Sequence, residues 1–158
     1  MEDFSYIKEP NLRGFAEWRH SLKAKIKPRQ PYQIPLTEFL LEFKPLDKME
    51  AILDIARKEV PGLRYNDLQF TNWPLWAKKK MIALEKQIIK RDMERSAAYL
   101  ELVELLKEKY PEKRAAINWG FAWPVLNADS HRLLIEAAVK NHKPVPPRVL
   151  ADYPDLQI

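Results

Sequence analysis

The sequence contains no cysteine and only three glycines among its 158 residues. Without cysteine the chain has no disulfide scaffold, no cysteine zinc site and no thiol nucleophile, and a reducing cytoplasm is its expected location. The scarcity of glycine and the lack of two-residue turn pairs such as Asn-Gly argue against β-hairpins. We therefore expect an all-α protein.

Long hydrophobic runs are also missing, since no apolar run approaches the roughly 20 residues of a membrane-spanning helix. The first ten residues include acidic side chains and do not look like a secretory signal. Apolar residues make up 46% of the chain and charged residues 31%, a balance typical of a folded, soluble protein. We predict a single helical domain over residues 1–158, with residues 1–36 as a candidate basic arm or annex.

No motif of an established catalytic site is present. The chain has no Gly-rich phosphate loop, no nucleophile elbow and no pair of histidines at helical metal-binding spacing. His131 falls on the apolar side of its expected helix, where a hydrogen-bonded core histidine is the simplest interpretation. Carboxylates spaced by three and four residues beside lysines are typical of a solvated helix face; they are Glu101, Glu104 and Glu108. We expect no enzymatic activity, no cofactor and no metal.

Thirteen prolines divide the chain into about five to seven helices of an irregular bundle joined by Pro-rich connectors. Asp47, with Glu50 three residues later, is the expected N-cap of the most regular of these helices. Apolar residues at three- and four-residue steps predict helices at residues 12–26, 47–60, 111–117 and 129–141, with short turns after Thr37 and Pro147. Residues 29–36 are expected to form an extended connector and a hinge.

Residues 75–109 contain neither glycine nor proline. One straight helix of this length would measure about 52 Å, whereas a compact domain of this size has a radius of gyration of about 15 Å. The apolar pattern is interrupted by the polar run at residues 90–96. We therefore expect two helices or one strongly bent helix, with Ser96 as the cap of the second.

The net charge of +5 is concentrated near the amino end. Residues 8–29 contain seven basic and two acidic side chains, and the remainder contains 20 of each. An uncompensated basic segment attracts polyanions, although short basic arms are also common solubilising features. We predict a nucleic-acid-binding surface here, formed by Arg19, His20, Lys23, Lys27 and Arg29.

A second candidate surface combines tryptophans with a run of lysines. Aromatic faces beside lysines suit the stacking of single-stranded bases, and the lysines are Lys78, Lys79 and Lys80. The tryptophans are also candidates for docking a protein partner, and the alternative for each is a structural anchor in the core. They are Trp73, Trp76, Trp119 and Trp123.

Residues 131–156 resemble a short helical segment of phage and plasmid polyvalent proteins and of some DNA methylases. The resemblance rests on a helix, a Pro-Val-Pro break and the pattern Val-Leu-x-x-Tyr-Pro-x-Leu; the matching residues are His131, Arg132, Pro144, Val145, Pro146, Val149, Leu150, Tyr153, Pro154 and Leu156. It implies a mobile-element context and action around DNA. Glycine usually precedes the break, where this chain has His142, so we expect a different turn. The segment also predicts a core helix followed by a folded-back apolar clip.

Two functions are consistent with these patterns. The first is a small non-catalytic accessory protein of a phage, plasmid or prokaryotic nucleoprotein system that binds nucleic acid non-specifically. The second is an assembly subunit or adaptor, for example a small helical subunit of a CRISPR-type complex, that docks through its Trp- and Pro-rich surfaces. Neither pattern specifies a base sequence.

Overall fold

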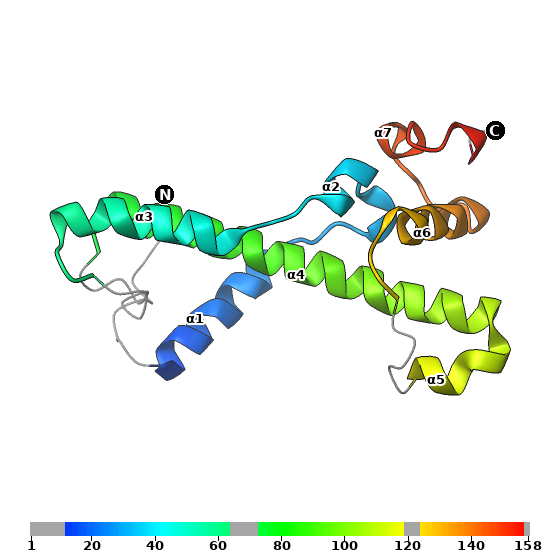
Figure 1. Cartoon of the computed structure of the whole chain (residues 1–158), viewed down its shortest axis with the longest axis horizontal. Helices are drawn as coiled ribbons and strands as arrows, with labels where there is room; N and C mark the ends of the chain where they lie inside the picture. The colour runs from blue at the N-terminus through cyan, green and yellow to red at the C-terminus, as the bar shows by residue number, and fades with distance from the viewer. Residues whose placement is uncertain (1–11, 64–72, 119–123, 157–158) are drawn as a thin grey trace. The chain divides into compact units, whose positions relative to one another are not determined.

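The chain folds into helices, and the described residues contain no strand. The computed structural model describes residues 12–63, 73–118 and 124–156, with side chains in the first range from residue 19 onward. The elements are α1 (Leu12–Lys25), η2 (Pro31–Gln33), α2 (Leu36–Leu40), α3 (Pro45–Glu59), α4 (Leu75–Lys109), η4 (Pro111–Lys113), α5 (Arg114–Asn118), α6 (Ala128–Lys140), α7 (Pro147–Leu150) and η5 (Pro154–Leu156), shown in Figure 1. The all-α prediction is confirmed. None of these helices has the length and apolar content needed to cross a membrane.

Several predicted boundaries need correction. The helix predicted at residues 47–60 begins at Pro45, so Asp47 lies in the first turn of α3 and is not its N-cap. Proline suits this position because the missing N–H would have no helical partner. The connector expected to be extended contains the 3-10 turn η2, and a second 3-10 turn, η5, follows Tyr153.

The expected break in the long helix is wrong. α4 runs without interruption from Leu75 to Lys109. Ser96 is exposed within it, whereas Glu94 and Ala98 are buried. The polar run at residues 90–96 therefore keeps one buried face, and the helix continues through it.

The chain divides into two compact units. Unit 1 comprises Met1–Lys27 and Phe43–Arg91, and unit 2 comprises Pro28–Glu42 and Asp92–Ile158. Each unit takes one part of α4. The candidate arm at residues 1–36 is shared between the units, because Met1–Lys27 belongs to unit 1 and Pro28–Glu42 belongs to unit 2.

Unit 1 contains α1, α3 and the first part of α4. The indole Nε1 of Trp76 donates to a carboxylate oxygen of Glu59 at 3.1 Å, and at the other end of α3 the guanidinium of Arg91 lies 6.0 Å from the Phe43 ring. These two contacts show that α3 and this part of α4 run antiparallel (Figure 1). The buried side chains include Leu22, Met49, Leu53, Ala56, Leu63, Trp73, Ala77, Met81, Ile82, Leu84 and Ile89. The predicted apolar stripe of α3 is confirmed.

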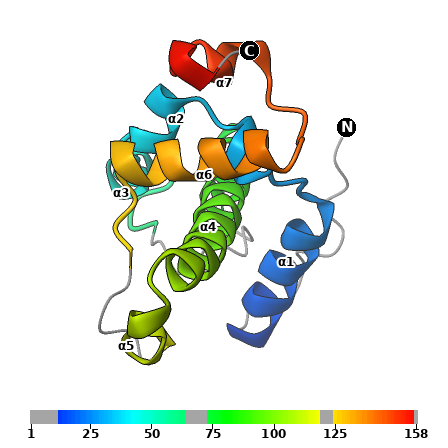
Figure 2. The same cartoon turned by 90° about the vertical axis from the view of Figure 1, so that its right-hand side faces the viewer.

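Unit 2 is built around α6, which contacts η2 and α2 (Figure 2). One apolar cluster joins the connector, α2, α4 and α6 through Ile34, Phe39, Ala98, Leu102 and Leu134. A second cluster joins α6 to the carboxyl-terminal segment through Ile135, Val139, Val145, Val149, Leu150, Tyr153 and Leu156. The predicted folded-back clip is therefore present.

His142 adopts the backbone conformation that usually requires glycine. Its φ is 57°, in the left-handed region. The N–H of His142 donates to the Val139 carbonyl at 3.1 Å, and the N–H of Lys143 donates to the Ala138 carbonyl at 2.9 Å. These two bonds define a Schellman helix end. The expectation of a different turn is wrong, because His142 adopts the left-handed conformation despite the steric cost of its Cβ.

His131 is a core histidine, as predicted. Its side chain is fully buried, Nε2 lies 2.6 Å from the Ile34 carbonyl and Nδ1 lies 2.6 Å from the Tyr153 hydroxyl. A carbonyl only accepts, so Nε2 carries the proton and Nδ1 accepts from the hydroxyl. Burial lowers the pKa of His131 from its usual 6.5, and the neutral ring satisfies both nitrogens.

Candidate nucleic-acid interface

The two units carry different charge. Unit 1 contains 17 basic and 10 acidic residues, a formal charge of +7, and unit 2 contains 10 basic and 12 acidic residues, a formal charge of −2. The positive excess is therefore wider than the amino-terminal stretch identified from the sequence. It includes the unit 1 part of α4, where residues 75–91 contain six basic side chains and one acidic side chain.

On one side of α4 in unit 1, the charged residues that belong to the helix itself are all lysines. At 100° per residue, four lysines and Trp76 fall within one sector of the helix, opposite the buried Met81 and Glu85. We call the four lysines the cationic face of α4; they are Lys79, Lys80, Lys86 and Lys90. Glu85 is the only carboxylate between residues 75 and 91, and its exposed fraction is 2%. No carboxylate of this helical stretch therefore opposes the field of the lysines.

The spacing of these lysines suits a row of phosphates. Lys79, Lys86 and Lys90 are separated by helical rises of about 10 and 6 Å. Each strand of duplex DNA carries one phosphate about every 3.4 Å along the axis. The spacing along the helix therefore matches separate phosphates, with Lys79 exposed and Lys86 and Lys90 half-buried.

The first predicted surface is partly occupied by carboxylates. The Nε of Arg19 lies 3.2 Å from the buried carboxylate of Glu85. Exposed side chains remain at His20, Lys23 and Lys27. The predicted basic stripe therefore retains His20 and Lys23 on α1, and Lys27 just beyond its end, on the surface of unit 1.

Arg29 belongs to unit 2 and links the connector to α4 and α2. Its guanidinium donates to both carboxylate oxygens of Glu94, at 3.0 and 3.2 Å, and to Glu38 at 2.9 Å. The hydrogen bonds to Glu94 are the main reason that the pKa of Arg29 is raised. With its donors committed to two carboxylates, Arg29 is a structural residue in this arrangement.

The tryptophans give little support to base stacking. Trp73 is buried, with an exposed fraction of 6%. Trp76 is half-buried, its Nε1 donates to Glu59, and the ammonium of Lys80 lies 5.6 Å from its ring centroid. Trp119 and Trp123 lie outside the described residues. The two described rings are thus engaged within unit 1.

Of the predicted lysine run, Lys79 and Lys80 are exposed and Lys78 is half-buried on the other side of the helix. The sequence interpretation missed Lys86 and Lys90 because it ended the helix near residue 90. If the helix is continued through the polar run at 100° per residue, Lys86 and Lys90 fall on the same side as Lys79. The signal was therefore present in the sequence.

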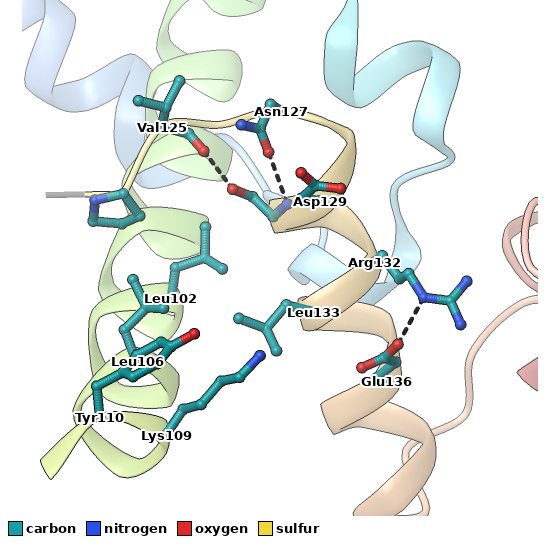
Figure 3. A pocket seen from close by; sticks show the side chains of 12 residues that line it. Leu102, Leu106, Lys109, Tyr110, Val125, Asn127, Asp129, Arg132, Leu133 and Glu136 are labelled. Carbon is teal, nitrogen blue, oxygen red and sulfur yellow. Dashed lines mark hydrogen bonds and ion pairs between the residues drawn. The ribbon is translucent and has the colours of Figure 1, made fainter.

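Unit 2 contains an open apolar groove between the end of α4 and the start of α6 (Figure 3). Leu102, Leu106 and Leu133 point into it, and Arg132 with Glu136, joined at 2.7 Å, stands on the α6 side. Among the described residues, no group of three or more His, Asp or Glu side chains is placed to hold a metal ion. Neither this groove nor the cationic face of α4 presents an arrangement that we recognise as a reaction centre.

Comparison with protein-family models, curated proteins and solved structures finds no significant match to this chain. Function must therefore be argued from the residues themselves.

Proposed function

We propose that unit 1 binds the phosphate backbone of nucleic acid and that the protein is a small non-catalytic accessory component of a phage, plasmid or prokaryotic nucleoprotein system. The observation that supports this most directly is the cationic face of α4, a row of four lysines on a helical stretch whose own single carboxylate, Glu85, is buried on the opposite side. The exposed Lys23 and Lys27 add charge to the same unit. The mobile-element context comes from the resemblance of residues 131–156.

Binding through this face would be insensitive to base sequence. Lysine ammonium groups act as point charges and contact phosphate oxygens, which carry no direct sequence information. The described tryptophans are committed to contacts within the unit. We therefore favour backbone binding over stacking of single-stranded bases.

The test is a titration of a short DNA duplex, followed by fluorescence anisotropy between about 50 and 200 mM salt. The variant replaces Lys79, Lys86 and Lys90 with glutamine. The slope of log affinity against log salt is negative, and each lost phosphate contact reduces its magnitude by about 0.9. We therefore expect the three substitutions to reduce the magnitude of the slope by about 2 to 3. Circular dichroism checks that the helices remain.

A matched control distinguishes the loss of this particular surface from the loss of total positive charge. Replacement of Lys109, Lys113 and Lys140, all exposed in unit 2, by glutamine removes the same number of charges. We expect this control to change the slope much less. An equal loss in both variants, or a wild-type affinity that does not respond to salt, contradicts the proposal.

A second candidate is an assembly subunit or adaptor. Its support is apolar side chains left in solvent, among them Leu46, Leu100 and Val125 with exposed fractions of 71, 64 and 69%. Burial of Trp73 weakens the original argument from tryptophan surfaces. The same titration separates the two functions, because an assembly subunit without a nucleic-acid role shows no salt-dependent affinity for the duplex.

A further inference from the structure

A pocket of about 450 Å³ lies in unit 2, where the connector, α4 and the end of α6 meet. Its lining is Gln30, Tyr32, Glu101, Ala138, Asn141 and Lys143. Five of these six side chains carry a polar or charged group. The pocket is thus chemically different from both the cationic face of α4 and the apolar groove of Figure 3.

The two charged residues of the pocket do not satisfy each other. Lys143 is close enough for its charge to lower the pKa of Glu101, yet no ion pair within 4.0 Å joins them. Glu101 is half-buried and makes no hydrogen bond to the described residues, and burial raises its pKa overall. A partly desolvated carboxylate without a donor costs folding free energy, which a bound donor would recover.

Glu101 therefore differs from the carboxylates with which it was grouped in the sequence. Glu104 is exposed and lies 3.3 Å from the ammonium of Lys107, and Glu108 is also exposed. These two belong to a solvated helix face, as predicted. Glu101 departs from that prediction only in part, because it is half-buried and lines a pocket together with residues of the connector and of the end of α6.

We propose that this pocket binds a small zwitterion of the α-amino acid class, with the ligand's ammonium at Glu101 and its carboxylate at Lys143. A simple anion would face the carboxylate of Glu101, and a simple cation would face the ammonium of Lys143. A ligand with both charges meets both residues favourably. The pocket volume lies in the range of small-molecule sites.

The remaining lining residues suit the rest of such a ligand. The amide of Asn141 both donates and accepts hydrogen bonds, and the hydroxyl of Tyr32 does the same. Ala138 is the apolar residue of the lining. None of this depends on unit 1, so the pocket and the nucleic-acid surface can be tested separately.

The first experiment screens each free proteinogenic amino acid against the full chain by thermal unfolding, followed by calorimetry of the best ligand. Two derivatives of that ligand serve as probes: the N-acetyl form, which lacks the ammonium, and the methyl ester, which lacks the carboxylate. We expect both to bind at least about tenfold more weakly. Absence of any amino acid that raises the Tm, or equal binding of the derivatives, overturns the proposal.

The second experiment uses Glu101→Gln and Lys143→Gln, with Glu104→Gln on α4 and Lys140→Gln at the end of α6 as matched controls. Each pocket variant should weaken binding at least about tenfold, and each control should bind as the wild type does. Glu101→Gln should also raise the Tm of the ligand-free protein, because a neutral amide costs less to desolvate than a carboxylate. A pocket variant with unchanged affinity overturns the proposal.

Discussion

At the scale of single residues, His131 holds three segments of unit 2 together with one imidazole. Its partners, the Ile34 carbonyl and the Tyr153 hydroxyl, lie 97 and 22 residues away in the sequence. Both contacts require the neutral ring with its proton on Nε2. Asp152 is the nearby charge that partly opposes the effect of burial on the pKa of His131.

This geometry predicts acid sensitivity. The folded-state pKa of His131 lies below 6.5, so the contribution of this residue to stability is complete above the unfolded-state pKa. As the pH falls below about 6.5 the unfolded state takes up the proton first, and the free energy of unfolding declines by up to about 1.4 kcal/mol per pH unit. Urea denaturation from about pH 5 to 8 measures this slope.

The variant His131→Phe provides the comparison. It removes the titrating group and both hydrogen bonds, so it should be less stable at neutral pH and should lose this part of the pH dependence. Wild-type stability that rises on acidification through this range would show that the ring does not stay neutral in the folded protein.

His142 is the other histidine with a consequence for stability. Glycine enters the left-handed region without the steric cost that a Cβ imposes, which is about 1 kcal/mol. Glycine also increases the entropy of the unfolded chain, so His142→Gly should raise the free energy of unfolding by about 0.5 kcal/mol. His142→Ala, which keeps the Cβ but removes the ring, should give no such gain. A destabilised glycine variant would indicate that the ring makes a stabilising contact.

At the scale of elements, the continuity of α4 gives a sharp prediction. A serine inside an exposed helix face is replaced by alanine with a small gain in helix propensity, whereas loss of a capping side chain costs about 1 kcal/mol. Ser96→Ala should therefore leave stability unchanged or raise it by up to about 0.5 kcal/mol. Asn127→Ala is the positive control, because Asn127 accepts a hydrogen bond from the Ser130 amide at 2.9 Å and caps α6. A loss at Ser96 as large as that at Asn127 contradicts one continuous helix.

The elements also show which parts of the fold are readable from the sequence. Apolar periodicity and proline placed α1, α3 and α6 to within a few residues, and the Pro-Val-Pro pattern indicated the folded-back clip. The long helix was misread because its length was judged against one compact domain, whereas two units each take part of it. The apolar period alone did not reveal that division.

The candidate surface was predictable only in part, for a different reason. A local pattern identifies Lys79 and Lys80, but the partner of Arg29 is Glu94, 65 residues away in the sequence. Arg19 is likewise paired with a carboxylate from another helix. Whether a basic residue is available to a polyanion depends on such distant contacts, which a charge count along the sequence does not contain.

At the scale of the whole molecule, the unequal charge of the units predicts an unequal response to salt. The +7 of unit 1 repels itself, and added salt screens that repulsion, whereas unit 2 is nearly neutral. Amide hydrogen exchange between about 20 and 300 mM NaCl should show protection rising more in the unit 1 part of α4 than in α6. Equal changes in both helices would mean that the charge is balanced locally by contacts within unit 1.

The connector Pro28–Glu42 has a consequence for the order of folding during synthesis. Its contacts to Glu94, His131 and Asp152 span 65, 97 and 116 residues, so the ribosome must deliver nearly the whole chain before they close. All residues of unit 1 have been translated by Arg91, well before the last of these partners appears. Long sequence separation also slows closure once the partners exist. A nascent chain therefore contains every residue of unit 1 while unit 2 still lacks the segments that complete its fold.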